Sequence, residues 1–330
     1  MGAGAIGCWI GGRLAADGND VTLIGRPHVM TELEHGLEVS ELGGKSWRSK
    51  PTLAIDASAA AGADLVLVTV KSAATAGAGA ELAHALRGSA IVASFQNGVR
   101  NPEVLRAALP GRSVLAGMVA YNVARVAPAH YHRGTTGELV LEAHDGAKPF
   151  VAACRAAGLA IAPRADIVAV QWGKLVMNLN NAINALSARS LFDELSDRDF
   201  RRCLAASQRE ALDVLAQAKL PVARLLALPP RVIVRLLPMP DWAFRLIANR
   251  VAGVDPAARS SMADDLAAGR ATEVDFLQGE IVALAERSGG RAPINAKLAA
   301  LVHAAEAGGQ RAFTGAELLA ALSPLRAPTA

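Results

Sequence analysis

A lysine and several asparagines lie within the otherwise apolar stretch 165–187. Lys174, Asn178 and Asn181 are spaced four and three residues apart, so in an α-helix their side chains project from nearly one side. The other positions are mostly Val, Leu, Ile and Ala, which predicts a buried helix. A lysine there can stabilise a developing negative charge and donate a proton, while the amides orient a substrate. The simpler alternative is a solvated lysine with capping asparagines at a helix end.

The composition describes a folded chain without a polyanionic partner. At 330 residues the chain is long enough for two domains, and a hydrophobic content of 52% excludes a disordered protein. The net charge of +4 comes without a block of basic residues, so we expect no nucleic-acid partner. The mild positive charge is compatible with an anionic cofactor or substrate.

Cysteine usage and hydropathy bear on the compartment. Cys8, Cys154 and Cys203 show neither metal-ligand spacing nor a disulfide framework, so we expect buried thiols, a reducing compartment and no metal. The most apolar tract, 220–254, is interrupted by five prolines and five arginines, which excludes a bilayer span. An amphipathic segment at a membrane surface is an alternative there, but short packed helices are favoured. We expect a cytoplasmic protein with no membrane partner.

A glycine-rich turn opens the chain. Gly2, Gly4 and Gly7 form G-x-G-x-x-G, followed by a helical run, a turn at 18–20 and a strand at 21–25. In a dinucleotide-binding unit these glycines permit a tight turn, the approach of a pyrophosphate and close packing of helix on strand. The motif therefore predicts a Rossmann-type domain.

A Rossmann unit also has a strand before its first glycine, whereas here only Met1 precedes Gly2. We therefore expect the first β-strand to be missing from this sequence, through truncation or through a start placed at an internal methionine. Without that central strand, cofactor affinity should suffer.

The second strand ends in Gly25-Arg26, where an NAD-specific fold usually carries Asp or Glu. A cation at this place suits a 2′-phosphate through charge-assisted hydrogen bonds. We infer NADPH as the cofactor; the alternative is an ordinary surface arginine.

Alternating strands and helices extend through residues 1–165. The apolar runs 63–72 and 89–98 read as parallel strands that end in Lys71-Ser72 and in Gln96-Asn97, at the edge where open α/β sheets bind ligands. Further strands are predicted at 113–123, 137–144 and 159–162, and helices at 75–87 and 102–108. This half is predicted to be α/β and doubly wound.

Residues 166–330 read as helices alone. They are predicted at 167–187, 197–219, 256–268, 273–289 and 293–307, with short helices in the proline-broken tract. A nucleotide-binding half followed by an all-helical half predicts an enzyme whose substrate sits between the two. The apolar helical half is also compatible with a homodimer.

Four separated blocks carry a family resemblance. They are V-K-S at Lys71, Q-N-G at Asn97, W-x-K-x-x-x-N at Lys174, and S-S-M…T-E-x-D, in which Ser261 and Glu273 are twelve positions apart. With the glycine turn, they resemble the ketopantoate reductase (2-dehydropantoate 2-reductase) family over essentially the whole chain. The resemblance implies a Rossmann domain followed by a helical domain like that of 6-phosphogluconate dehydrogenase. It also implies NADPH-dependent reduction of 2-dehydropantoate to pantoate, in pantothenate and coenzyme A biosynthesis.

The resemblance assigns roles residue by residue. Lys174 would be the general acid, and Glu273 would contact cofactor and substrate near the reacting carbon. The residues implied in cofactor binding are Gly2, Gly4, Ala5, Ile6, Gly7, Arg26, Lys71, Asn97, Val123 and Glu273. Those implied in substrate binding are Asn97, Lys174, Asn178, Asn181 or Asn184, and Ser261, the last for the carboxylate.

Two departures from the family pattern affect the substrate site. The second asparagine usually lies four residues after the first, where this chain has Ala182, so either Asn181 or Asn184 could take its place. An asparagine that many members carry three residues before the serine is Ala258 here. This departure bears on how the distal hydroxyl of the substrate is recognised.

In the expected reaction, NADPH delivers hydride to the C2 ketone of a 2-oxo acid and Lys174 protonates the oxygen. Burial should lower the pKa of Lys174, and Glu273 should oppose that shift. One rival is a related reductase of another 2-oxo acid. A second, from another class, is a protein that senses NADPH without turnover, and a third is an inactive chain lacking its first strand.

Overall fold

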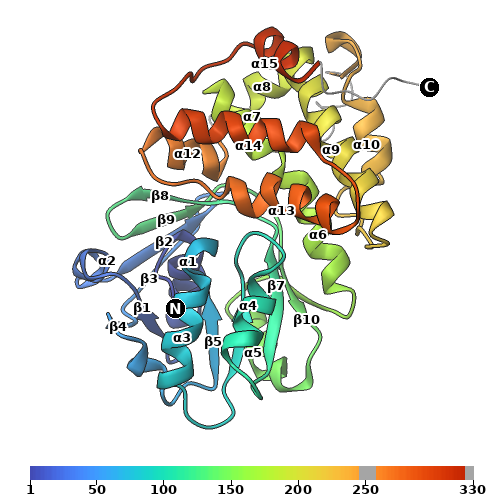
Figure 1. The fold of residues 1–330 in the computed structure, drawn as a ribbon. Coiled ribbons are helices and arrows are strands. Elements are labelled where there is room, and N and C mark those ends of the chain that lie inside the picture. Colours follow the sequence, from blue (N-terminus) through green and yellow to red (C-terminus); the bar gives the residue numbers. More distant parts are fainter. Residues whose placement is uncertain (245–257, 324–330) are drawn as a thin grey trace. The chain divides into compact units, whose positions relative to one another are not determined.

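The computed structural model describes residues 1–244 and 258–323 (Figure 1). The chain divides into two compact units, Met1–Ile167 and Val168–Ala330. The first is built of strands and helices, and the described part of the second is helical. The predicted fold class, an α/β domain followed by an all-α domain, is confirmed.

The main sheet of the first unit has the strand order β11-β10-β7-β6-β5. Its strands are β5 Leu65–Val68, β6 Ile91–Ser94, β7 Val114–Val119, β10 Leu139–Glu142 and β11 Ile161–Arg164. β5, β6 and β7 run parallel, and all of β6 is buried, which explains its continuous apolar run. β10 is antiparallel to β7, a mixed pairing that the sequence did not reveal.

A separate parallel pair is formed by β1 (Thr22–Ile24) and β4 (Thr52–Ala54). The opening residues connect this pair to the main sheet. Met1 is hydrogen-bonded on the β5 side, to the carbonyl of Leu67 at 2.6 Å and the amide of Thr69 at 2.9 Å. The amides of Gly2 and Ala3 donate to Ile24 of β1 at 2.9 and 3.2 Å.

A four-stranded sheet, β3-β2-β9-β8, was not predicted. Its strands are β2 Leu37–Glu41, β3 Ser46–Ser49, β8 Val123–Ala127 and β9 His130–Arg133. The predicted strand 113–123 is wrong at its end, because β7 stops at Val119 and Val123 begins β8. At four and five residues, β3 and β8 are at the short end of the runs that a hydrophobic pattern can identify, so they were not predicted.

Helices complete the first unit. They are α1 Ala5–Ala16, α2 Pro27–Leu33, α3 Thr75–Ala85, α4 Asn101–Ala108 and α5 Lys148–Ala156, with 3₁₀ turns η1 Ala57–Ala60, η2 Ser72–Ala74 and η3 Asp145–Ala147. α1 buries Trp9 and Ile10 in a core shared with Leu37 and Val39 of β2. The helix that follows the glycine turn therefore forms part of this core.

The described helices of the second unit match most of the predicted ones. They are α6 Ile167–Asn178, α7 Asn180–Ser187, α8 Leu191–Ser196, α9 Arg198–Gln217, α10 Pro230–Leu236, α12 Ser261–Ala267, α13 Val274–Arg287, α14 Pro293–Glu306 and α15 Gly315–Leu322. The helix predicted at 256–268 begins at Ser261, and its first two residues lie outside the described ones, as does part of the tract 220–254. None of the helices in 1–244 and 258–323 is long and apolar enough to cross a membrane.

The predicted single helix 167–187 is wrong, because it is interrupted at Leu179. Gln278 of α13 donates to the carbonyl of Leu179 at 2.8 Å, and Gln208 of α9 donates to that of Val176 at 3.0 Å. Side chains that bond helix carbonyls compete with the helix's own amides and are a common cause of kinks. The interruption thus arises from tertiary contacts rather than from the local sequence.

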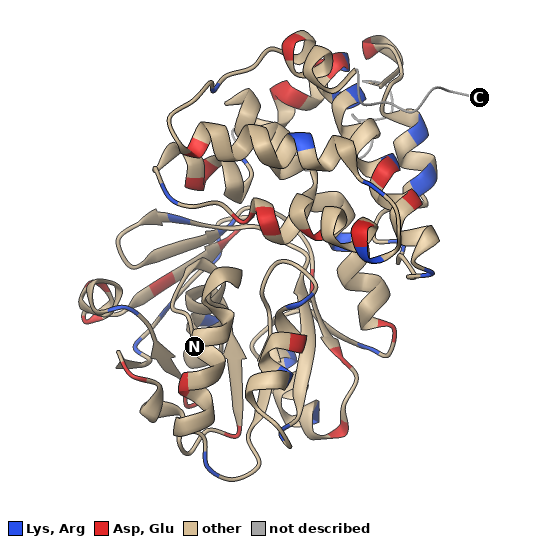
Figure 2. Ribbon diagram, viewed as in Figure 1, with Lys and Arg blue, Asp and Glu red and all other residues tan. Residues whose placement is uncertain are grey.

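The three cysteines are buried and free, as predicted. Burial raises the pKa of the Cys8 thiol to about 11 and that of Cys154 to about 12. Figure 2 shows acidic and basic residues interspersed along the described ribbon of both units. No single-sign stretch of ribbon stands out there.

Arg201 is a fully buried cation on α9. Its guanidinium donates to the carbonyls of Leu195, Leu237 and Met239 at 2.9, 2.9 and 2.8 Å. It also donates to Asp241 at 2.7 Å. This one side chain therefore joins the ends of α8 and α10 to α9.

We predict that Arg201→Ala lowers the free energy of unfolding by roughly 3–5 kcal/mol, because it leaves a cavity and unpaired carbonyls. Urea denaturation measures the loss. Arg202→Ala is the matched control, since its ion pair with Asp199 is partly exposed and is worth less than about 1 kcal/mol. Equal losses in the two variants would contradict a special role for Arg201.

Candidate functional site

Gly4 leaves open space at the start of α1. It is the N-cap of this helix, with φ −85° and ψ −169°, and as a glycine it has no side chain with which to cap the N-terminus. A Cβ placed on Gly4 would meet no atom of the described residues within 4 Å. The amides of the first turn, from Ala5 to Gly7, are of the kind that bind phosphate groups.

The other two glycines of the motif are required for close packing. Gly2 has φ +100°, and a Cβ there would lie 2.5 Å from the amide nitrogen of Val70. A Cβ on Gly7 would lie 2.6 Å from Oγ1 of Thr69 and would collide with the carbonyl of Gly2. Thr69 Oγ1 donates to that same carbonyl at 2.7 Å, so the turn is fixed on the end of β5.

Arg26 lies just after the end of β1, where the sequence predicts a contact with the ribose 2′-phosphate of a cofactor. It follows Gly25, whose amide donates to Ala54 of β4 at 3.0 Å. Arg26 is the N-cap of α2, and its side chain is exposed. A guanidinium in this setting is accessible to an anionic group.

Lys71 and Asn97 follow the neighbouring strands β5 and β6. Lys71 is exposed at the N-cap of η2, and Asn97 is partly buried. Ser72 donates its hydroxyl to the carbonyl of Asn97 at 3.0 Å, and Asn101 donates its amide to the same carbonyl at 2.6 Å. Because one carbonyl accepts both bonds, the two loops are held together.

Gln96, beside Asn97, strengthens this edge. Its side-chain amide donates to the carbonyl of Val70 at 3.0 Å and to Thr75 at 2.7 Å, and its oxygen accepts from Ser94 at 2.9 Å. Gln96 is buried, so these bonds satisfy a group that would otherwise be costly there. The predicted Lys71 and Asn97 are thus carried on one rigid polar edge of the sheet.

Lys174 is partly buried on α6, two residues from the buried Trp172. Burial lowers the pKa of Lys174 to about 8. Among the residues that the structure describes, burial is the one cause of this shift, so the expected opposing effect of Glu273 is not found there. A lysine with a pKa near neutrality exchanges its proton more readily than a solvated one.

The three candidate asparagines differ in their surroundings. Asn178 and Asn181 are partly buried, whereas Asn184 is fully buried. The Asn184 amide nitrogen donates to Glu194 at 2.7 Å and to the carbonyl of Arg189 at 3.1 Å. Its oxygen accepts from the amide of Ser260 at 2.8 Å. The hydrogen bonds of the Asn184 side chain therefore join α7, α8 and α12.

The S-S-M block begins α12. Ser260 is the buried N-cap and accepts from the amide of Ala263 at 3.1 Å, and Ser261, the next residue, is exposed. Ser260 also donates to the carbonyl of Asn181 at 3.3 Å. α12 and α7 pack together, so the structure brings Ser261 and the asparagines of α7 into one part of the second unit.

Glu273 is the N-cap of α13 and is partly buried. Its neighbour Thr272 donates its amide to Glu306 at 2.7 Å. His303 bridges Glu306 and Asp275 at 2.9 and 2.8 Å, and its hydrogen bonds to these carboxylates raise the pKa of His303. Glu306 therefore holds the backbone just before Glu273, and His303 holds the Asp275 side chain just after it.

Sequence reasoning missed these supports, and also Glu194. His303 and Glu306 are spaced three residues apart on a helix, which is the only local signal they offer. Within the described residues, no group of His, Cys, Asp and Glu side chains is arranged to hold a metal ion.

Comparisons with known proteins agree on one family. The family model described as "Ketopantoate reductase PanE/ApbA" matches residues 1–146, and "Ketopantoate reductase PanE/ApbA C terminal" matches residues 166–306. A 2-dehydropantoate 2-reductase of Halobacterium salinarum is 30% identical over 94% of this chain and 98% of its own length. One of Archaeoglobus fulgidus is 31% identical, over 93% of this chain and 97% of its own.

A solved structure supports the same assignment. The ketopantoate reductase family protein from Ralstonia eutropha JMP134 superposes with a TM-score of 0.80 at 32% identity, covering 93% of this chain and 97% of its own. The sequence resemblance is thereby confirmed. This chain belongs to the ketopantoate reductase family of nicotinamide-dependent oxidoreductases.

Proposed function

We propose that this chain reduces 2-dehydropantoate to pantoate with NADPH, as a step of pantothenate biosynthesis. The observation that carries the proposal is Lys174, whose pKa burial lowers to about 8 on a helix that also carries Asn178. Residues 1–165 would serve as the cofactor domain and 166–330 as the substrate domain. A homodimer and a cytoplasmic location stay predictions.

The glycine turn fits a dinucleotide. The open space at Gly4 and the uncapped start of α1 suit a pyrophosphate, while Gly2 and Gly7 have no room for larger side chains. When bound, the cofactor supplies the hydride. Arg26 would pair with a 2′-phosphate, which supports NADPH rather than NADH. Lys71, Asn97 and Val123 are proposed as further cofactor contacts.

Lys174 is proposed as the general acid. As the C2 carbonyl of the substrate is reduced, negative charge builds on its oxygen, and an ammonium within hydrogen-bond reach stabilises that charge. With a pKa of about 8, Lys174 is largely protonated at pH 7, yet releases its proton more easily than a solvated lysine. Glu273 is proposed to contact cofactor and substrate without changing this pKa.

Neutral groups are proposed to orient the substrate. Asn178 and Asn181 supply amides, and we favour Asn181 over Asn184 because the Asn184 side chain is buried and hydrogen-bonded to three groups. The exposed Ser261 hydroxyl would bind the carboxylate. These hydrogen bonds position the carbonyl without adding charge.

A second candidate is reduction of a different 2-oxo acid. The observation that favours it is Ala258, whose methyl side chain cannot hydrogen-bond a distal hydroxyl. A comparison of kcat/KM for 2-dehydropantoate and for branched 2-oxo acids without that hydroxyl separates the candidates. A protein that only senses NADPH would turn over none of them.

We predict that the wild-type chain oxidises NADPH with 2-dehydropantoate and that Lys174→Ala lowers kcat by roughly 10²–10⁴, the range for a positioned acid. The absorbance of NADPH, followed during turnover, measures the activity of the wild type and of the variant. Lys297→Ala, an exposed lysine of α14, is the matched control and should leave kcat unchanged. Near-wild-type turnover in Lys174→Ala would remove this lysine from the mechanism.

The same assay over pH tests the protonation state. Since Lys174 acts protonated, kcat/KM should fall as the pH rises through about 8, and this limb should be absent in Lys174→Ala. A rate that is flat up to pH 10 would contradict the lowered pKa.

We predict that Arg26→Ala reduces the preference for NADPH over NADH by about tenfold or more, because it removes a charge-assisted contact to the 2′-phosphate. The ratio of kcat/KM for the two cofactors is the measurement. Arg87→Ala, another exposed arginine of the same unit, should leave the ratio unchanged. An unaltered ratio in Arg26→Ala would assign cofactor choice elsewhere.

We predict opposite effects at two glycines. Gly4→Ala should fold with wild-type stability, since its methyl meets no atom of residues 1–244 and 258–323. It should weaken NADPH binding by about tenfold or more by occupying the space of the pyrophosphate. Gly7→Ala should lower the melting temperature, because its methyl collides with the glycine turn. Thermal melts and NADPH titration test both. A Gly4→Ala variant that binds normally would place the pyrophosphate elsewhere.

A further inference from the structure

Glu194 is a fully buried carboxyl that the mechanism above does not use. It lies on α8, and buried glutamates are rare unless they are paired or hydrogen-bonded. Its Oε2 accepts from the amide nitrogen of Asn184 at 2.7 Å. Its Oε1 is buried and lacks a well-formed hydrogen bond within the described part of the chain.

The Asn184 side chain connects this carboxyl to the start of α12. An asparagine amide has a donor side and an acceptor side, so an acceptor on one side determines which way the amide faces. Because Glu194 accepts from Nδ2, Oδ1 is turned toward the amide of Ser260, at 2.8 Å. Ser260 immediately precedes Ser261, the proposed ligand of the substrate carboxylate.

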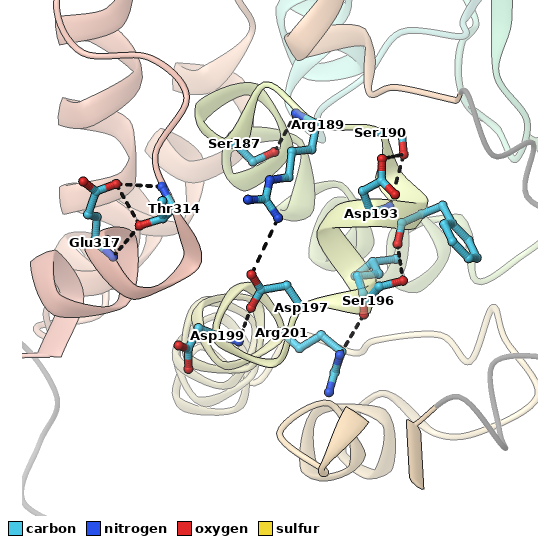
Figure 3. A network of polar contacts seen from close by, with 12 residues as sticks. Ser187, Arg189, Ser190, Asp193, Ser196, Asp197, Asp199, Arg201, Thr314 and Glu317 are labelled. Carbon is cyan, nitrogen blue, oxygen red and sulfur yellow. Dashed lines mark hydrogen bonds and ion pairs between the residues drawn. The ribbon is translucent and has the colours of Figure 1, made fainter. Parts of the chain in front are cut away.

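Polar contacts hold both ends of α8, the helix that carries Glu194 (Figure 3). Ser190 caps its first turn by accepting from the amide of Asp193 at 3.1 Å. Arg189, just before the helix, pairs with Asp197 of the next helix at 3.7 Å. Arg201 donates to the carbonyl of Leu195 at 2.9 Å. Both ends of α8 are therefore anchored.

We propose that Glu194 is a positioning residue that orients Asn184 and, through the Ser260 amide, places the Ser261 hydroxyl for the substrate's carboxylate. This inference rests on the proposed function for its substrate. The hydrogen-bonded sequence of Glu194, Asn184 and Ser260 runs from α8 through α7 to α12. It gives one role to a carboxyl whose burial would otherwise be unexplained.

The protonation state of the carboxyl is consistent with this role. Burial raises the pKa of Glu194 to about 8, and interactions with the amides of Asn184 and Asn180 oppose that rise. No charged group in 1–244 or 258–323 contributes to the shift. The carboxyl is therefore mostly neutral at pH 7 and still offers an acceptor oxygen to Asn184. A glutamine at this place would imitate it closely.

Two variants separate positioning from general stability. Glu194→Met fills a similar volume but removes the acceptor, whereas Glu194→Gln retains it. With Glu194→Met we expect KM for 2-dehydropantoate to rise by roughly tenfold, with kcat changed less and the Kd for NADPH unchanged. Glu194→Gln should restore KM to near the wild-type value. Glu286→Ala, an exposed carboxylate of α13, is the control.

Hydrogen–deuterium exchange of the 258–264 segment gives a readout that does not depend on the substrate. Exchange of the Ser260 amide should become faster in Glu194→Met and stay at the wild-type rate in Glu194→Gln. Unchanged exchange and KM in Glu194→Met would overturn the inference, as would equal rises in KM in both variants. If the wild type does not turn over 2-dehydropantoate, the proposed function fails, and exchange alone still decides whether Glu194 holds the start of α12.

Discussion

The burial of uncharged amide side chains is the constraint on which the second unit depends. Asn184, Gln278 and Asn295 are fully buried, and each bonds to another helix. Burying an amide is costly unless it is hydrogen-bonded, so each of these bonds favours one arrangement of the neighbouring helices. The helix carrying Lys174 is held by such bonds at Val176 and, just after its end, at Leu179. These amide hydrogen bonds therefore help to hold Lys174 in the buried position that lowers its pKa.

The first unit depends instead on the close approach of two backbone segments. The opening turn lies against the end of β5 because Gly2 and Gly7 occupy the two contact positions. The hydroxyl of Thr69 donates a hydrogen bond to the carbonyl of Gly2 and holds the turn there. At the ends of β5 and β6, Gln96 donates to the carbonyl of Val70 and Asn101 donates to the hydroxyl of Ser72, which joins loops 26 and 29 residues apart in sequence. The rigid edge that results carries the groups proposed to meet the cofactor, which is the usual place for a ligand in an open α/β sheet.

Much of this arrangement could be predicted, because strong periodicity and compositional change are local properties. The runs that became β5 and β6 are apolar on both faces, and α9, α13 and α14 follow a helical pattern. The break at Leu179 could not be foreseen, since its partner Gln278 is 99 residues away. Glu194 was missed for a related reason: a glutamate in an isolated sequence resembles a surface residue until its surroundings are known. The choice between Asn181 and Asn184 likewise depended on partners contributed by α8 and α12.

The buried cysteines can report on local opening of the protein core. With thiol pKa values near 11 and 12, Cys8 and Cys154 carry almost no thiolate at neutral pH, and burial also screens them from reagents. A thiol-directed reagent can therefore react at an appreciable rate only during excursions that open the core around each sulfur. Cys8 and Cys154 lie in the first unit and Cys203 in the second. The labelling rate of each cysteine would thus record how often its own unit opens, without any engineered tag.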